Sequence, residues 1–185
     1  MTFPTHPDRG VTLIELLVAI AILAILAGLA LPAFGTAGQS LASQSARSQL
    51  TVSLAQARAS AVMLRGDVVA CPSRDQVSCS NEVQWHHGWM VFRDRNRNRR
   101  PDTGETVIAV AQAQAAGVAI VGSTGRRTLR FLADGTSDGS NATLAVCDRR
   151  GAAHARVLVI NNAGRVRSGP ANAAQAATAC AAVGR

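Results

Sequence analysis

The sequence has 185 residues, a length that suits one ordinary domain with an appendage and is too short for two full domains. Only 3% of the residues are aromatic and Tyr is absent, so any core must consist mainly of Val, Leu, Ile and Ala. The formal net charge is +8, and every Lys or Arg position holds Arg. This charge favours an anionic partner such as nucleic acid or a membrane surface. The codon usage of a GC-rich genome would also produce an Arg-rich chain, so composition alone does not identify an anionic binding partner.

A polar segment precedes a long apolar run at the N-terminus. Residues 1–10 are polar, whereas residues 16–31 form an unbroken apolar stretch. Roughly 20 apolar residues span a bilayer as a helix, and we predict a transmembrane helix over residues 11–34. The basic leader would stay in the cytoplasm, which places the rest of the chain outside. A secretory signal peptide is the alternative, but the run is long for one and contains Glu15.

The residues around Glu15 resemble a known family motif. A carboxylate in hydrocarbon costs about 2.5 kcal/mol or more, so this one needs a partner. Residues 10–17, Gly-Val-Thr-Leu-Ile-Glu-Leu-Leu, resemble the prepilin motif of type IV pilins and type II secretion pseudopilins, although Val11 stands where Phe or Met is commoner. The resemblance implies cleavage after Gly10 by prepilin peptidase and methylation of the new amine on Val11. It also implies that Glu15 meets the N-terminal amine of a neighbouring subunit during assembly.

The helical pattern continues beyond the apolar run. Pro32 would kink or end the first helix, and pilins often carry a proline about here with the helix continuing beyond it. Over residues 35–66 we predict an amphipathic continuation that ends at Gly66. Its buried stripe is expected to consist of Leu50, Leu54, Ala57, Ala61 and Leu64.

After Gly66 the pattern changes to short strands separated by turn signals. Strands are predicted over residues 68–71, 88–93, 106–111, 118–121, 128–132, 143–147, 156–160 and 165–168. Many short strands at this spacing indicate antiparallel sheets packed on the helix, an α+β fold with a pilin-like head over residues 67–185. The Ala-rich tail from Ala171 has no clear pattern.

The four cysteines predict disulfides if the head lies in the periplasm. None forms a CxxC pair, and zinc spacings are missing. Four cysteines allow three connectivities. We favour Cys71 with Cys79, which closes a short loop, and Cys147 with Cys180, which tethers the tail, but the sequence does not decide among them.

The head also resembles one branch of the pilin family. Trp85, residues 88–94, residues 104–105 and residues 164–167 resemble the FimT/GspH group of minor pilins and pseudopilins. The FimT branch is linked to DNA capture by type IV pili during natural transformation. Its C-terminal signature, Gly-Arg-x-Arg, is matched here by Gly164, Arg165, Val166 and Arg167.

The chemistry of this segment is compatible with phosphate binding. Residues two apart on a strand share a face, so Arg165 and Arg167 would point together, about 6.6 Å apart, while Val166 packs inward. The Arg fork binds phosphate, and Gly164 would supply the sharp turn. Further arginines are candidates for widening the patch: Arg149, Arg150, Arg126, Arg127 and Arg130. The alternative is that two arginines on an exposed strand form a solvated face.

Other constellations carry weaker signals. Residues 94–105 place Asp94, Asn96, Asn98, Asp102 and Glu105 at calcium-loop positions. However, Arg99 replaces the invariant Gly and the surrounding arginines would repel a cation, so we predict a hydrogen-bonded turn, no metal and no cofactor. The adjacent His86 and His87 would face opposite ways in a strand. We find no catalytic arrangement and assign Trp85 and Trp89 to the core.

The sequence therefore predicts a minor pilin that is processed, inserted in the inner membrane with its head in the periplasm, and incorporated into a pilus. Its partners would be other pilin subunits, prepilin peptidase, inner-membrane lipid before assembly, and the phosphate backbone of DNA. The alternative is a GspH-like minor pseudopilin with a structural role in a type II secretion system.

Overall fold

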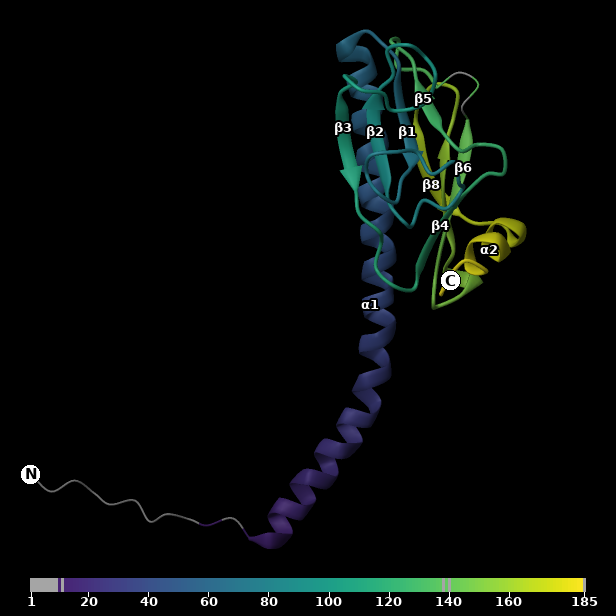
Figure 1. Cartoon of the computed structure of the whole chain (residues 1–185). Helices are drawn as coiled ribbons and strands as arrows, with labels where there is room; N and C mark the ends of the chain where they lie inside the picture. Colours follow the sequence, from purple (N-terminus) through teal and green to yellow (C-terminus); the bar gives the residue numbers. More distant parts are fainter. Residues whose placement is uncertain (1–9, 11, 138, 140, 185) are drawn as a thin grey trace, which may run out of the picture. The chain divides into compact units, whose positions relative to one another are not determined.

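The computed structural model describes residues 10, 12–137, 139 and 141–184, with side chains omitted for residues 29–34. Residues 1–9 of the predicted leader and Val11, the predicted methylation site, lie outside these residues. The elements, labelled in Figure 1, are α1 (Leu13–Leu64), β1 (Val68–Pro72), β2 (Trp89–Arg93), β3 (Val107–Ala111), β4 (Val118–Gly122), β5 (Leu129–Phe131), β6 (Ala142–Asp148), the 3-10 helix η1 (Ala152–His154), β7 (Arg156–Ile160), β8 (Val166–Pro170) and α2 (Ala173–Cys180). All eight predicted strands are present, with every end within two residues of the prediction and β7 at its predicted bounds.

The chain divides into two compact units, Met1–Gly38 and Gln39–Arg185. The helix α1 contributes to both and continues beyond position 32, as the sequence predicted. In the first unit, the described apolar side chains of α1 are exposed, from Leu13 at 77% to Leu26 at 57%.

A search of the described residues finds no helix whose length and apolar character would let it cross a membrane.

The end of α1 differs by one residue from the prediction. Arg65, not Gly66, adopts the left-handed conformation, with φ of 46°. The Arg65 N–H donates to the Val62 carbonyl and the Gly66 N–H donates to the Ala61 carbonyl, which is the Schellman pattern. Arg93 Nη2 also donates to the Leu64 carbonyl at 3.2 Å. The carbonyl groups of Ala61, Val62 and Leu64 in the last turn are therefore satisfied without a left-handed glycine.

Two four-stranded antiparallel sheets make up the head. The strand order is β3-β2-β1-β5 in the first sheet and β4-β6-β7-β8 in the second. In the second sheet, Ala142 pairs with Ile160, and Ile160 pairs with Val166 across the β7–β8 hairpin. The strand β8 is therefore an edge strand, and its hairpin turn lies at the end of the sheet where β6 begins.

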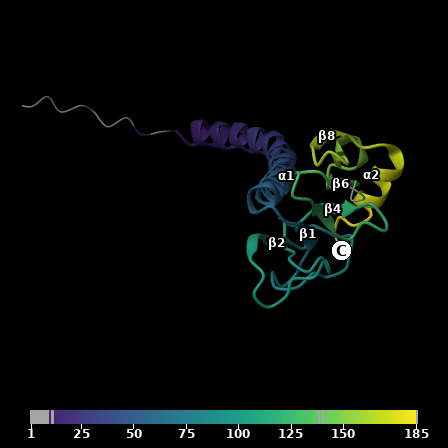
Figure 2. The ribbon, with the colours of Figure 1, turned by 90° about the horizontal axis from the view of Figure 1, so that it is seen from above.

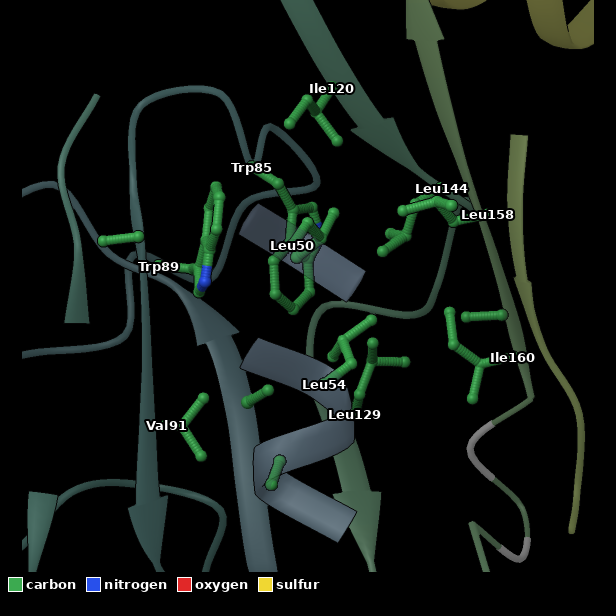
Figure 3. Close-up of a cluster of buried hydrophobic side chains, with 14 of the residues drawn as sticks. Leu50, Leu54, Trp85, Trp89, Val91, Ile120, Leu129, Leu144, Leu158 and Ile160 are labelled. Atoms are coloured by element: carbon green, nitrogen blue, oxygen red, sulfur yellow. The ribbon is translucent and has the colours of Figure 1, made fainter. Parts of the chain in front are cut away.

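The main core lies between α1 and both sheets. Along α1, the completely buried stripe consists of Ala46, Leu50, Leu54, Ala57 and Ala61. This stripe confirms the predicted one except at Leu64, the last residue of α1, which is 37% exposed. Figure 3 shows Leu50 and Leu54 with Trp89 of β2 on one side and Leu144, Leu158 and Ile160 of the second sheet on the other, while the ring of Trp85 overlaps Leu50 in this view. The fold is α+β, as predicted.

A disulfide anchors a short helix on the far face of the second sheet. Alternate residues of β6 face opposite ways, so Leu144 points to the main core and Ala145 to a second cluster with Ala176 and Ala179 of α2. Figure 2 shows α2 beside β4 and β6. Asn172 and Gln175 form a capping box at the start of α2, a signal in the Ala-rich tail that the sequence analysis missed. The disulfide between Cys147 and Cys180 fixes this helix to the sheet.

The second disulfide joins Cys71 and Cys79 on the outer face of the first sheet. Cys71 belongs there to a small buried cluster with Val69, Met90 and Phe92. Both disulfides have the pairing that the sequence analysis favoured.

A buried carboxylate connects α1 to the end of β6. Asp148 accepts hydrogen bonds from Arg150 Nε and Nη2, each at 2.9 Å, and from the side chain of Ser43 on α1. Burial alone would raise the pKa of the Asp148 carboxyl. The hydrogen bonds from Arg150 and Ser43 outweigh burial and lower the pKa below its ordinary value of 3.8.

We predict that Asp148→Asn lowers the free energy of unfolding by about 2 kcal/mol at neutral pH, because the buried donors lose a charged acceptor. A lowered native pKa means that this stabilisation is complete above the ordinary carboxyl pKa and is lost as the pH falls through the native pKa. The variant should therefore lose less stability than the wild type on acidification. Urea unfolding of the full chain in neutral detergent across an acid pH series measures both effects.

The control is Glu82→Gln, which breaks the exposed ion pair with Arg74 and should reduce stability by about 0.5 kcal/mol. Equal losses in the two variants would contradict the role of Asp148.

Candidate functional site

The start of α1 carries a capping box formed by Thr12 and Glu15. The Glu15 N–H donates to Thr12 Oγ1, and the Thr12 N–H and hydroxyl donate to Glu15 Oε2, all at 3.3 Å. The Thr-x-x-Glu spacing before an apolar run is readable from the sequence, but the sequence analysis missed it. Glu15 thus has a local partner within its own chain. Gly10, the residue before the predicted cleavage point, is exposed.

The β7–β8 hairpin turn carries the Gly-Arg-x-Arg segment. The Gly164 N–H donates to the Asn161 carbonyl at 2.8 Å, and the Arg165 N–H donates to Asn161 Oδ1 at 3.0 Å. Gly164 has φ of 71°, the left-handed region that favours glycine. The turn predicted at Gly164 is therefore present and is held by Asn161.

Gly164 is also a point of close packing between the hairpin, α1 and the β5–β6 loop. A Cβ at Gly164 would overlap the carbonyl oxygen of Gly135 and lie 3.1 Å from Arg58 Nε. Arg58 Nε donates to that same Gly135 carbonyl at 2.8 Å. The neighbouring Ser137 N–H donates to the Asn162 carbonyl of the turn at 2.7 Å. Only a residue without a side chain fits between these groups.

Beyond Gly164, two arginines flank a side chain that faces the core. Arg165 and Arg167 are exposed, whereas Val166 is half-buried and packs against the main core. This alternation is the one expected from the strand period. Arg165, Arg167 and Arg58 line a groove of about 810 Å³ between α1 and β8.

The groove is positively charged without internal neutralisation. Among the described residues, no carboxylate forms an ion pair with Arg58, Arg165 or Arg167. Arg58 was not identified as a site residue from the sequence. Its contact with Gly135 joins residues 77 positions apart, and no local pattern signals such a contact.

The structure does not bring the other candidate arginines to this groove. Arg149 and Arg150 follow β6, at the end of the sheet opposite to the β7–β8 turn, and Arg150 is paired with Asp148. Arg126 and Arg127 precede β5 in the other sheet and line a different hollow. Arg130 lies on β5 and pairs with Asp67 at 3.5 Å.

The loop with calcium-like spacing is closed by its own hydrogen bonds. Asp94 accepts from the N–H groups of Asn98 and Arg99, and Glu105 accepts from the Arg95 N–H at 2.7 Å. Across the residues that the structure describes, no group of three or more His, Cys, Asp or Glu side chains could hold a metal ion.

The expectation that His86 and His87 face opposite ways is wrong, because both lie in a turn rather than a strand. Their ring centroids are 4.2 Å apart. His86 Nδ1 lies 3.1 Å from the Ile120 carbonyl oxygen, which connects the turn to β4. Burial, followed by the charges of His86 and Arg74, lowers the pKa of His87. Trp85 and Trp89 are completely buried, which confirms their assignment to the core.

Comparisons with known proteins agree with this architecture. Residues 46–164 match the family described as type II transport protein GspH, and residues 6–31 match the prokaryotic N-terminal methylation motif. No curated protein matches the sequence at a significant level.

Two crystal structures of the type IV minor pilin FimU from Pseudomonas aeruginosa are similar to this chain. The first is 23% identical with a TM-score of 0.54, and the match covers 69% of this chain and 92% of the FimU chain. The other is 20% identical with a TM-score of 0.55, and covers 79% of this chain and 97% of FimU. At these identities the likeness shows the fold alone.

A long N-terminal helix that begins within a methylation motif and packs on antiparallel sheets defines a type IV pilin-like subunit. Because the GspH match extends over more than half of the sequence, the chain belongs to the family of type II transport protein GspH. This result confirms the family that the leader and head motifs resemble.

We predict that Gly164→Ala destabilises the head by at least about 2 kcal/mol, because a left-handed alanine is strained and its Cβ displaces the Gly135 carbonyl. The matched control is Gly104→Ala. Gly104 also has a positive φ, of 89°, but a Cβ there meets no atom within 4 Å. The control should therefore lose only about 1 kcal/mol, the backbone term alone. Urea unfolding of both variants measures the difference, and equal losses would show that the hairpin does not depend on this contact.

Proposed function

We propose that the chain is a minor pilin that is incorporated into a pilus and binds DNA non-specifically through its head, for uptake in natural transformation. One observation carries the proposal. Arg165 and Arg167, together with Arg58, line a single groove and have no ion-pair partner among the described residues. Guanidinium groups that are not neutralised within the protein are available to an external phosphate.

The backbone around the pair reduces the entropy that binding must overcome. The Asn161 side chain accepts a hydrogen bond from the Arg165 N–H within the turn, and Arg58 donates to the Gly135 carbonyl, which packs against Gly164. Arg165 and Arg167 therefore extend from a fixed backbone, so mainly their own side chains are ordered on binding. Contacts of this kind involve the phosphate backbone and not the bases, so the binding should be independent of sequence and sensitive to salt.

The N-terminal unit supplies the assembly part of the proposal. Prepilin peptidase would cut after Gly10, the amine of Val11 would be methylated, and Glu15 would exchange its contact with Thr12 for the amine of a neighbouring pilin subunit. The exposed apolar side chains between Leu13 and Leu26 would contact inner-membrane lipid before assembly and other subunits afterwards. The two disulfides suit a head that is exposed to the oxidising periplasm and later to the cell surface.

A second candidate function is a minor pseudopilin with a structural role in type II protein secretion. The description of the matching family, type II transport protein GspH, favours it. In that function the head would contact other subunits, and Arg165 and Arg167 would not bind DNA.

We predict that Arg165→Gln with Arg167→Gln weakens DNA binding by about tenfold or more at low salt. It should also reduce the slope of log affinity against log salt by about 2, because each phosphate contact contributes about 0.9 to that slope. The matched control, Arg74→Gln with Arg156→Gln, removes the same charge from positions that line neither the β8 groove nor the hollow beside β5. Fluorescence anisotropy of a labelled duplex, with the full chain in neutral detergent, measures both quantities.

If the wild type does not bind DNA, or the hairpin variant and the control behave alike, the groove is not a DNA site. The pseudopilin function would then be the better assignment.

A further inference from the structure

A second basic hollow lies beside the first sheet. It has a volume of about 720 Å³ and is lined mainly by two segments, residues 98–102 and residues 125–128, which we call its first and second wall. Arg99 and Arg100 belong to the first wall, and Arg126 and Arg127 belong to the second. The Cys71–Cys79 disulfide holds the chain segment that supplies the remaining lining, which includes Asn81.

The charge of this hollow is not balanced from within. Among the described residues, none of the four arginines forms an ion pair, and Arg126 has a single side-chain contact, to Asn141 Oδ1 at 3.5 Å. The carboxylate in the lining, Asp102, accepts hydrogen bonds from the side-chain amides of Asn96, at 2.8 Å, and Asn98. Like charges gathered in a concave surface focus the field there and attract an anion.

The first wall has a fixed backbone. The buried Asp94 carboxylate accepts from the Asn98 N–H at 3.1 Å and from the Arg99 N–H at 2.9 Å, and Asn98 Oδ1 accepts from the Arg100 N–H at 2.7 Å. Arg99 has φ of 60°, a conformation in which Gly or Asn would be more favourable. The hydrogen bonds of Asp94 and Asn98 thus fix the loop backbone that carries Arg99 and Arg100. Within the described residues, no carboxylate forms an ion pair with either arginine.

We propose that this hollow is a second phosphate site, which holds one strand of the sugar–phosphate backbone of nucleic acid. The identity of the polyanion rests on the proposed DNA-binding function. Four guanidinium forks from two separate segments exceed what a single phosphate can contact, so the ligand is a polymer of phosphates. The side chains of Asn81 and Thr128 add donors for sugar and phosphate oxygens. Among the described residues, no aromatic side chain lines the hollow. Binding would therefore rest mainly on phosphate contacts, and the site should accept a duplex or a single strand.

This hollow is separate from the groove beside β8. Its arginines belong to loops that flank the first sheet, whereas Arg165 and Arg167 lie at the edge of the second sheet. Two phosphate sites on one head would contribute separately to the salt dependence of binding. The losses of binding free energy caused by variants at the two sites should therefore add.

The test compares three full-chain variants that each lose two positive charges. The hollow variant is Arg99→Gln with Arg127→Gln, one from each wall; the hairpin variant is Arg165→Gln with Arg167→Gln; the control is Arg74→Gln with Arg156→Gln. Affinity for a fluorescein-labelled duplex, and for its separate single strand, is measured across a salt series in neutral detergent. We expect the hollow variant to weaken binding of both probes by about tenfold and to reduce the salt slope by about 2, as the hairpin variant does. The control should change neither value.

The outcomes separate the two proposals. If the hollow variant behaves like the control while the hairpin variant loses affinity, the hollow is not a phosphate site and the proposed function stands. If only the hollow variant loses affinity, the hollow is the DNA site and the assignment to Arg165 and Arg167 is wrong. If the wild type binds neither probe, both proposals are overturned. Urea unfolding checks each variant, and Arg99→Gly with Arg127→Gln replaces the hollow variant if it is unstable, because glycine tolerates the left-handed conformation.

Discussion

Burial of one stripe of α1 against both sheets is the contact on which the rest of the head depends. The stripe combines two large side chains, Leu50 and Leu54, which fill the space between the sheets, with the smaller Ala46, Ala57 and Ala61. Core positions in such an arrangement tolerate little change of volume, because each side chain touches neighbours from several strands. The first sheet and the second sheet are thereby held on one helix, although they share no continuous ladder.

The candidate DNA groove is a direct product of that packing. Arg58 follows the buried Ala57 and therefore sits at the border of the stripe, where it reaches the Gly135 carbonyl. The Gly135 loop in turn leaves room for nothing but a glycine at position 164. A chain of contacts thus connects the core of the helix to the backbone from which Arg165 and Arg167 extend. The function proposed for these arginines depends on a contact that no single segment of the sequence encodes.

Local features of the fold could be predicted from the sequence because they depend on residues close together in the chain. The helical stripe, the eight strands and the Gly164 turn follow from periodicity and turn chemistry. The prepilin motif identified the family because its signals lie within a few residues of one another.

Features that depend on distant residues could not be predicted in the same way. The division of the strands into two sheets, the contact of Arg58 with Gly135 and the joining of the walls that carry Arg99 and Arg127 all arise from long-range pairing. Arg149 and Arg150 were predicted to widen the patch of Arg165, but they lie at the opposite end of the second sheet, and Asp148 pairs with Arg150. An arginine in a predicted turn therefore does not reveal which distant segment of the chain lies beside it.

Side-chain NMR of the full chain with isotope-labelled arginine, titrated with duplex DNA, tests the central claim most directly. The claim is that DNA contacts defined arginines and does not respond only to the net charge. We expect the side-chain N–H signals of Arg165 and Arg167 to shift on binding, while those of Arg74 and Arg150, each held by a carboxylate, stay unchanged. Uniform small shifts of all arginine signals, or shifts that leave Arg165 and Arg167 unaffected, would contradict the account.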